Sequence, residues 1–593
     1  MKFSSWCLAA VITLSGGTAS IGVIGTNAEE ASCNVTVESP YIQPKFMIDG
    51  TITTDFTSTS SSASLSDVYG CCTMEGGGDG VVSSSSSDVT LKRPLIGKMP
   101  QMSKDQTLQV LKDVETAWDN GRGVWPQMSL RQRIDAVSNV LDELETNQRE
   151  AMVNVLMWEI GKNRKDAESE FDRTIAFGRQ VMEAMKESEF SGSWQSIGST
   201  MAFVRRAALG IVLCLGPMNY PLNETYATLI PALLMGNVVL MKIPTVGGLV
   251  HLLTMEAFQK ILPKGAMSFV SGRGRDSMPV LMETGKVDVL AFIGGSGAAD
   301  DLIHQHPHPH RLKVFLQLEG KNMGIFLPDL FEGPEEDLSK AMDQALIGSL
   351  SFNGQRCTAL KLFFVPEAHG DKFAGLLTSR VESLNVGLPW QTWNGDETAD
   401  SGPDKYSDIT PLPNSKRTDL MRRLIDDAVS KGAKIMNERG GEIIGGPEST
   451  LMVPAVLYPV TPEMDIYHEE QFGPVVPIAT YDNLDTVRDY GQNGFTAQQA
   501  SIFLGESGTE DAARILDEFS TVFGKININS QCGRSPDTLP FSGRRSSAMG
   551  VMSVRDALRE MSVPTVVAYK DSKTNNDIMQ GIESVSTFLQ PLL

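Results

Sequence analysis

The chain has 593 residues, of which 41% are hydrophobic and 21% charged, and this balance excludes a wholly disordered protein. A formal net charge of −21 argues against nucleic acid as a partner, because phosphate backbones bind to basic surfaces. An anionic ligand would need arginines gathered at its own site. The seven cysteines lack zinc-ligand spacing, so we interpret them as thiols and expect no metal site.

The first 100 residues differ in composition from the rest. Residues 1–25 resemble a targeting signal, because Lys2 precedes a short apolar run that small residues follow. This favours a secretory route, or a route through it to a plastid, with the cytoplasm as the alternative. Residues 26–100 are rich in Ser, Thr and Gly, and we interpret them as a low-complexity linker without a core. The folded body is expected to begin near Met102, and the mature chain to have no membrane partner, because no later run reaches about 18 apolar residues.

Helical and strand patterns alternate beyond residue 102. Apolar residues recur at helical spacing from Leu130 to Leu144, behind Ser129 as a candidate N-cap. Short apolar runs then alternate with a helical segment, which predicts a parallel sheet with crossover helices. Ligands bind beyond the carboxyl ends of such strands. The strands are expected at 211–215, 238–241, 267–270 and 287–293, and the helix at 222–235.

Three polar segments carry candidate chemistry. Cys357 follows Phe-Asn-Gly-Gln-Arg, and a thiolate activated by nearby positive charge attacks carbonyl carbons. Asn219 follows a predicted strand, where its amide could stabilise the oxyanion formed in that attack. Lys242 ends the next strand and could bind ribose hydroxyls or a phosphate. A single cysteine in a polar loop is usually inert, so the interpretation depends on the three segments together.

With Glu-Glu-Gln-Phe-Gly-Pro at residues 469–474, these segments stand in the order that identifies the aldehyde dehydrogenase superfamily, which the chain resembles over about residues 105–570. The resemblance implies that Cys357 is the nucleophile and Asn219 the oxyanion donor. The implied reaction forms a thiohemiacetal, transfers a hydride to a nicotinamide and then releases the acyl group.

The same resemblance implies a cofactor site. Lys242 would be a ligand, and Glu470 would bind the nicotinamide ribose with Phe472 packed beside it. Thr245 stands where NAD-specific members often have Glu, and it leaves room for a 2′-phosphate, so NADP is favoured over NAD. If Thr245 merely ends the strand, that preference falls. The glycine-rich turns expected near the cofactor contain Gly272, Gly294, Gly295 and Ser296.

Within the superfamily the chain is most similar to the non-phosphorylating glyceraldehyde-3-phosphate dehydrogenases, which convert glyceraldehyde 3-phosphate to 3-phosphoglycerate. The resemblance implies three guanidiniums and a phenol around the substrate phosphate, which would make charge-assisted contacts with it. The alternative is that each arginine forms an ordinary surface ion pair. The residues concerned are Arg173, Tyr220, Arg356 and Arg534.

One segment departs from the family pattern. Gln317 stands where the family has the Glu that activates water, and glutamine cannot accept a proton as a base. Glu319, two residues on, is a candidate substitute on the same side of an extended segment, and a shift of the local alignment by one turn is the alternative. Three alternatives stay open: Glu319 activates water, coenzyme A or another acceptor takes the acyl group, or the protein is a slow or non-catalytic member.

The expected fold class is α/β, with a Rossmann-type dinucleotide-binding domain, an α/β catalytic domain and a small β extension for oligomerisation. By resemblance we expect a homodimer or homotetramer that acts on a small phosphorylated aldehyde. The expected boundaries are 101–317 for NADP binding, interrupted by oligomerisation strands at about 192–210, then 318–555 for catalysis and 556–593 for a last strand and tail.

Overall fold

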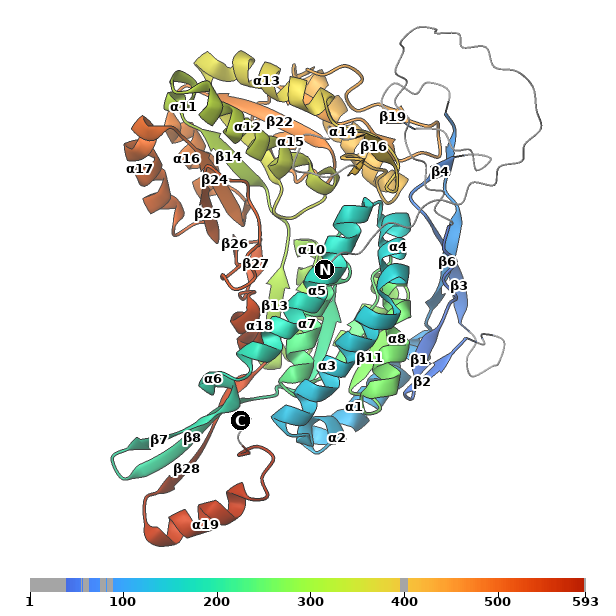
Figure 1. Ribbon diagram of the computed structural model, residues 1–593, viewed down its shortest axis with the longest axis vertical. Coiled ribbons are helices and arrows are strands. Elements are labelled where there is room, and N and C mark those ends of the chain that lie inside the picture. Colours follow the sequence, from blue (N-terminus) through green and yellow to red (C-terminus); the bar gives the residue numbers. More distant parts are fainter. Residues whose placement is uncertain are drawn as a thin grey trace, which may run out of the picture.

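The computed structural model describes residues 39–54, 56, 63–74, 82, 89–394 and 404–590. The signal-like segment 1–25 lies outside these residues. No helix in the described part is long and apolar enough to cross a membrane. Two sheet-centred lobes lie side by side, and a narrow arm extends from them (Figure 1).

The first lobe contains a six-stranded sheet in the order β11-β10-β9-β12-β13-β27. All its pairings are parallel except that of β27 with β13, which confirms the parallel sheet predicted from the short apolar runs. Lys242 pairs with Leu215 on one side and Val270 on the other, so the carboxyl ends of these strands lie level. The strands are β9 (Ile211–Leu215), β10 (Val238–Lys242), β11 (Met267–Val270), β12 (Val289–Ile293), β13 (Lys313–Gln317) and β27 (Ala548–Met549).

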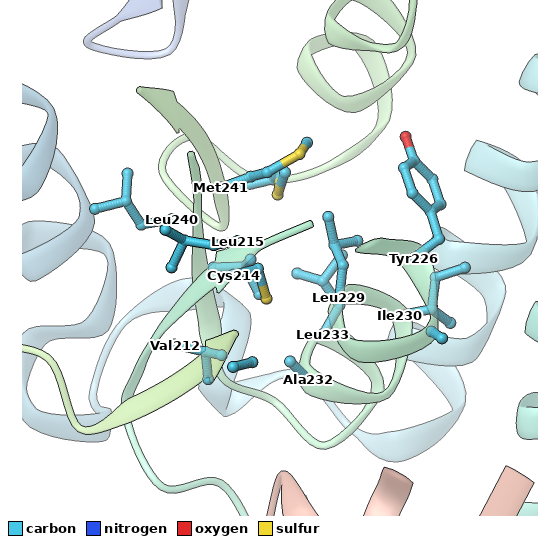
Figure 2. Packing of buried hydrophobic residues seen from close by; sticks show 14 of the residues in the cluster. Val212, Cys214, Leu215, Tyr226, Leu229, Ile230, Ala232, Leu233, Leu240 and Met241 are labelled. Atoms are coloured by element: carbon cyan, nitrogen blue, oxygen red, sulfur yellow. The ribbon is translucent and has the colours of Figure 1, made fainter. Parts of the chain in front are cut away.

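Helices cover both faces of this sheet. Ser129 caps one of them, as the sequence predicts, and the structure adds a reciprocal capping box between the Ser129 hydroxyl and the Gln132 side chain. Figure 2 shows apolar side chains of another helix, among them Leu229 and Leu233, packed against β9 and β10. The helices include α1 (Lys104–Trp118), α3 (Leu130–Asn147), α4 (Arg149–Ile160), α5 (Arg164–Ala184), α7 (Asn223–Leu234), α8 (Leu249–Ile261), α9 (Gly274–Met282) and α10 (Ser296–Gln305).

The second lobe contains a seven-stranded sheet in the order β18-β21-β22-β15-β14-β24-β25. The boundary that we propose between the lobes, after residue 317, falls where β13 ends. The strands are β14 (Asn322–Phe326), β15 (Leu360–Pro366), β18 (Lys434–Ile435), β21 (Ala455–Tyr458), β22 (Val475–Tyr481), β24 (Gln499–Phe503) and β25 (Lys525–Ile528). The helices around them include α11 (Pro328–Glu332), α12 (Glu335–Leu350), α13 (Gly370–Glu382), α14 (Ser415–Ser430), α16 (Leu484–Asn493) and α17 (Thr509–Phe519).

The arm is a three-stranded antiparallel sheet that points away from both lobes (Figure 1). It consists of β7 (Ser193–Ile197), β8 (Thr200–Ala207) and β28 (Val563–Lys570), which lie in the two segments expected to form the oligomerisation extension. The last helix, α19 (Lys573–Glu583), contacts the arm through Met579 and through a hydrogen bond from Trp194 to Glu583.

The linker prediction for residues 26–100 is wrong for the part that the structure describes. Short strands run along the outside of both lobes (Figure 1), and their side chains pack into the cores, with Phe46 2% and Ile96 0% exposed. A few apolar residues between the Ser and Gly runs are enough to hold these strands in place, because most of the core against which they pack belongs to the lobes. The strands are β1 (Phe46–Ile48), β2 (Thr51–Thr53), β3 (Ser64–Tyr69), β4 (Thr73–Met74), β5 (Leu91–Lys92) and β6 (Leu95–Gln101).

Candidate active site

A cavity of about 1080 Å³ lies where loops from both sheets meet. The loop after β9, the end of β12 and the loop before β15 all reach it, so its walls come from the carboxyl ends of strands and from the second lobe. Most of the candidate residues line this cavity: Arg173, Asn219, Tyr220, Gly294, Gly295, Gln317, Glu319, Arg356, Cys357, Glu470, Phe472 and Arg534.

The loop that carries Cys357 has an unusual backbone. Phe352, Asn353 and Gly354 have φ angles of 49°, 56° and 69°, which is the left-handed region in three successive residues. A Cβ on Gly354 would lie 2.7 Å from the carbonyl oxygen of Gly473. The Asn353 side chain anchors the loop, since it donates to the Thr410 hydroxyl and accepts from the Thr410 amide. This anchoring holds the turn that presents Cys357.

Asn219 and Cys357 meet at this loop. The Asn219 Nδ2 donates to the carbonyl of Gln355, at 2.8 Å, two residues before the cysteine. Asn322 fixes the other side, because its Nδ2 donates to the Cys357 carbonyl at 2.6 Å. The Cys357 side chain is half-buried and lines the cavity. Asn219 and Cys357 therefore line the same cavity, with the Asn219 amide bonded to the loop that carries the cysteine.

Burial sets the protonation of the thiol. Burial, followed by the carboxylates of Glu224 and Glu470, raises the pKa of Cys357 to about 11, and the Lys361 ammonium opposes this shift. The resting form is therefore the neutral thiol at physiological pH, and positive charge that enters the cavity would favour the thiolate.

Carboxylates accompany the arginines of the candidate phosphate site. Arg173 forms two hydrogen bonds with Asp537, at 2.7 and 3.0 Å. Arg534 pairs with Glu224 at 2.5 Å and with Asp537 at 3.2 Å. The Nη2 of Arg534 and the Nε of Arg356 are buried without a hydrogen-bond partner among the described residues.

Tyr220, the fourth residue of the candidate phosphate site, also lines the cavity. A buried lysine, Lys162, lies 3.4 Å from the centre of the Tyr220 ring and pairs with Glu170 at 2.8 Å. The Tyr220 ring also packs edge-on against Phe352 of the cysteine loop. The phenol, the cysteine loop and helix α5 are thereby fixed relative to one another.

Lys242, Thr245 and Gly272 do not line this cavity; they lie at the adjoining carboxyl ends of β10 and β11. Lys242 is 6% exposed and forms no hydrogen bond or ion pair within the described residues, and burial lowers its pKa to about 8. Thr245 is exposed, and Gly272 has a φ of +113°. Arg273 follows with an exposed side chain. A buried amine without a partner is a fitting ligand for the hydroxyls or phosphate of a nucleotide.

Glu470 and Phe472 lie on a loop that two buried lysines hold. Lys361 donates to the carbonyl of Gln471 and lies 3.5 Å from Glu470, and Lys321 donates to the Gln471 side chain at 2.6 Å. Burial raises the pKa of Glu470, although Lys361 and the Gly320 amide oppose the shift. The Lys361 ammonium also lies 4.6 Å from the Phe472 ring centre.

Gln317 and Glu319 have different surroundings although they lie two residues apart. Gln317 ends β13, is 3% exposed, and neither of its amide atoms has a hydrogen-bond partner in the described part of the chain. Glu319 accepts from the backbone amide of Ser296 at 2.8 Å and from its hydroxyl at 2.5 Å. The carboxylate therefore sits on the first residue of helix α10.

Comparison with known proteins decides the family. Residues 85–567 match the profile of the Aldehyde dehydrogenase family. The chain belongs to this family. It is an oxidoreductase that oxidises aldehydes with NAD or NADP, and the α/β fold expected from the sequence is confirmed.

Relatives with known names share most of the chain. An NADP-dependent glyceraldehyde-3-phosphate dehydrogenase of Streptococcus equinus is 30% identical over 79% of this chain and 91% of its own length. One from Arabidopsis thaliana is 27% identical over 82% and 92%. The crystal structure of the Bacillus halodurans enzyme of that name, complexed with NADP, has 26% identity and a TM-score of 0.73, with 89% of this chain and all of that chain covered.

Several site residues escaped the sequence reasoning. Glu224, in the first turn of α7, resembles an acid that stabilises a helix end, and nothing in the sequence shows that it faces Cys357 and Arg534. Asp537 lies within the late motif that supplies Arg534, and its spacing of three residues is the signal that could have revealed the pair. Lys162 gives no signal, because a lysine after a helix is usually exposed.

Proposed function

We propose that this aldehyde dehydrogenase oxidises a phosphorylated aldehyde with NADP, with glyceraldehyde 3-phosphate as substrate and 3-phosphoglycerate as product. The observation that supports it most is the gathering of Arg173, Arg356, Arg534 and Tyr220 at one cavity with Cys357. Two of the guanidiniums keep buried N–H groups that have no partner in the described part of the chain, and a phosphate dianion can satisfy them.

In the proposed reaction the Cys357 sulfur adds to the aldehyde carbon while the Asn219 amide donates to the carbonyl oxygen. A nicotinamide supplies the acceptor for the hydride that leaves this carbon. The thioacyl group on Cys357 then reacts with water, which breaks the C–S bond and gives the carboxylic acid and the free thiol. The phosphate, held by the arginines, would keep the carbonyl carbon near the sulfur throughout.

NADP is proposed over NAD on the local charge at β10 and β11. Lys242 has no side-chain partner among the described residues, Arg273 is exposed three residues after Val270, with which Lys242 pairs, and Thr245 adds no negative charge. A 2′-phosphate would find two cations and a hydroxyl there. The NADP-dependent relatives agree with this preference.

A second function has one observation in its favour. Gln317 is neutral in the cavity, so the base for water attack must come from elsewhere, and Glu319 is the candidate that we retain. The alternative is transfer of the acyl group to the thiol of coenzyme A, which regenerates Cys357 and gives an acyl thioester without a water-activating base.

The test is NADPH formation from NADP and glyceraldehyde 3-phosphate, with and without coenzyme A, against unphosphorylated glyceraldehyde. The proposal predicts a kcat/KM higher for the phosphorylated aldehyde and independent of coenzyme A. Equal kcat/KM values for the two aldehydes would contradict the proposed phosphate site, and an absolute requirement for coenzyme A would favour the second function.

A further inference from the structure

Glu319 supplies an anion to the end of helix α10. Both its oxygens accept hydrogen bonds from Ser296, one from the backbone amide and one from the hydroxyl. Helix α10 begins at Ser296, directly after the glycine turn that ends β12. A helix N-terminus with free amides after such a turn attracts phosphate groups, and here a carboxylate of the chain takes that place.

Two neighbouring helices are capped in a similar way, but their caps are inaccessible. Glu159 accepts from the amides of Gly248 and Leu249 at the start of α8, and Glu170 accepts from Leu222 and Asn223 at the start of α7. Their exposed fractions are 3% and 2%. Glu319 is half-buried and lines the cavity, so a ligand can reach and displace it.

We infer that Glu319 competes with the diphosphate of the cofactor for Ser296, so that the cofactor binds by displacing this carboxylate. The inference rests on the proposed function, which places a dinucleotide at the Gly294–Gly295–Ser296 turn. One backbone amide donates one strong hydrogen bond, and a carboxylate and a diphosphate at one helix end repel each other. Glu319 therefore lowers the affinity for the dinucleotide.

Displacement has a consequence for the cavity. Glu319 and Glu470 line the same cavity, and the charge of Glu319 adds to the effect of burial in raising the pKa of Glu470. Released from Ser296, Glu319 stays in the same wall, where it is available for deacylation. Cofactor binding and release of the candidate base become one event.

The experiment measures equilibrium binding of NADPH to the full chain by fluorescence, without substrate. It compares the natural protein with Glu319→Gln, with Glu319→Ala and with Glu283→Gln, a control that removes one exposed negative charge from the same lobe at the end of α9. Adenosine 2′-monophosphate, which lacks the diphosphate, serves as a competing ligand. Thermal unfolding of each unliganded protein is measured in parallel.

We expect Glu319→Gln to bind NADPH about tenfold more tightly, the difference made by one charge-assisted contact, and Glu319→Ala to change in the same direction. The affinity for adenosine 2′-monophosphate should stay the same, and the unliganded Glu319→Gln protein should melt at a lower temperature because the helix loses its cap. Tighter binding together with lower stability is a pair that a purely structural role does not produce.

Unchanged or weaker NADPH binding by Glu319→Gln would overturn the inference. Equal tightening for NADPH and adenosine 2′-monophosphate, or for Glu283→Gln, would also overturn it, because the effect would then be general electrostatics. If no folded variant binds NADPH, the proposed cofactor itself is wrong, which is a different result.

Discussion

Replacement of Glu224 by Gln tests the electrostatics around the candidate nucleophile. Glu224 is the first of two carboxylates that raise the pKa of Cys357, after burial itself. Its removal also leaves Asp537 as the remaining carboxylate partner of Arg534, so the positive charge of this guanidinium is less compensated in the cavity. Both effects have the same sign, so the pKa of Cys357 should fall below its value of about 11.

The magnitude follows from titration. With a pKa of about 11, roughly one Cys357 in 10⁴ is a thiolate at pH 7, and each unit by which the pKa falls raises that fraction about tenfold. Since only the thiolate reacts with iodoacetamide, the alkylation rate rises with pH up to the pKa. The assay is peptide mapping of Cys357 alkylation in the unliganded enzyme between pH 6 and about 11. The Glu224→Gln profile should be displaced to lower pH.

Glu283→Gln is the matched control, because it removes the same charge at an exposed site away from the cavity lining. Its profile should coincide with that of the natural protein. An unchanged or higher apparent pKa in Glu224→Gln would refute the electrostatic reasoning.

Three further outcomes are expected. Arg534→Met should lower kcat/KM for glyceraldehyde 3-phosphate about 100-fold but leave unphosphorylated glyceraldehyde much less affected, and equal losses would contradict a phosphate contact. Gly354→Ala, whose Cβ would lie 2.7 Å from the Gly473 oxygen at a φ of +69°, should lower the free energy of unfolding by about 2 kcal/mol in urea denaturation, and an unchanged value would contradict the strain. Lys162→Met should lower the free energy of unfolding by about 3–5 kcal/mol, because it leaves the Glu170 carboxylate buried without a counter-charge. The double variant with Glu170→Gln should recover part of this loss. A double variant less stable than Lys162→Met alone would contradict this.

The sheets were predictable because their strands are buried on both faces. Ile211–Leu215 and Val238–Lys242 are continuous apolar runs with turn residues after them, and this pattern survives without any knowledge of tertiary contacts. The strands between residues 46 and 101 lacked such a signal. These strands pack against the core of a lobe and need only a few apolar residues of their own, such as Phe46 and Ile96. The composition of the segment alone therefore indicates a linker.

The site was predictable where a residue acts through its own chemistry and its place at a strand end. Cys357 and Asn219 were singled out in this way and the arginines by the family resemblance, and the structure places all of them in the lining of one cavity. Ion-pair partners that lie far apart in the sequence were not predictable: Glu224 and Arg534, which pair in the cavity wall, are 310 positions apart. Nor does the sequence indicate that Glu319 accepts hydrogen bonds from Ser296, since the two residues lie 23 positions apart.

The central claim is that Cys357 carries the acyl group. The direct measurement is mass spectrometry of the protein quenched during turnover with NADP and glyceraldehyde 3-phosphate, followed by peptide mapping. We expect a 3-phosphoglyceroyl thioester on the peptide that contains Cys357, and neither adduct nor NADPH formation in Cys357→Ala. Turnover retained by Cys357→Ala, or an adduct on another residue, would contradict it.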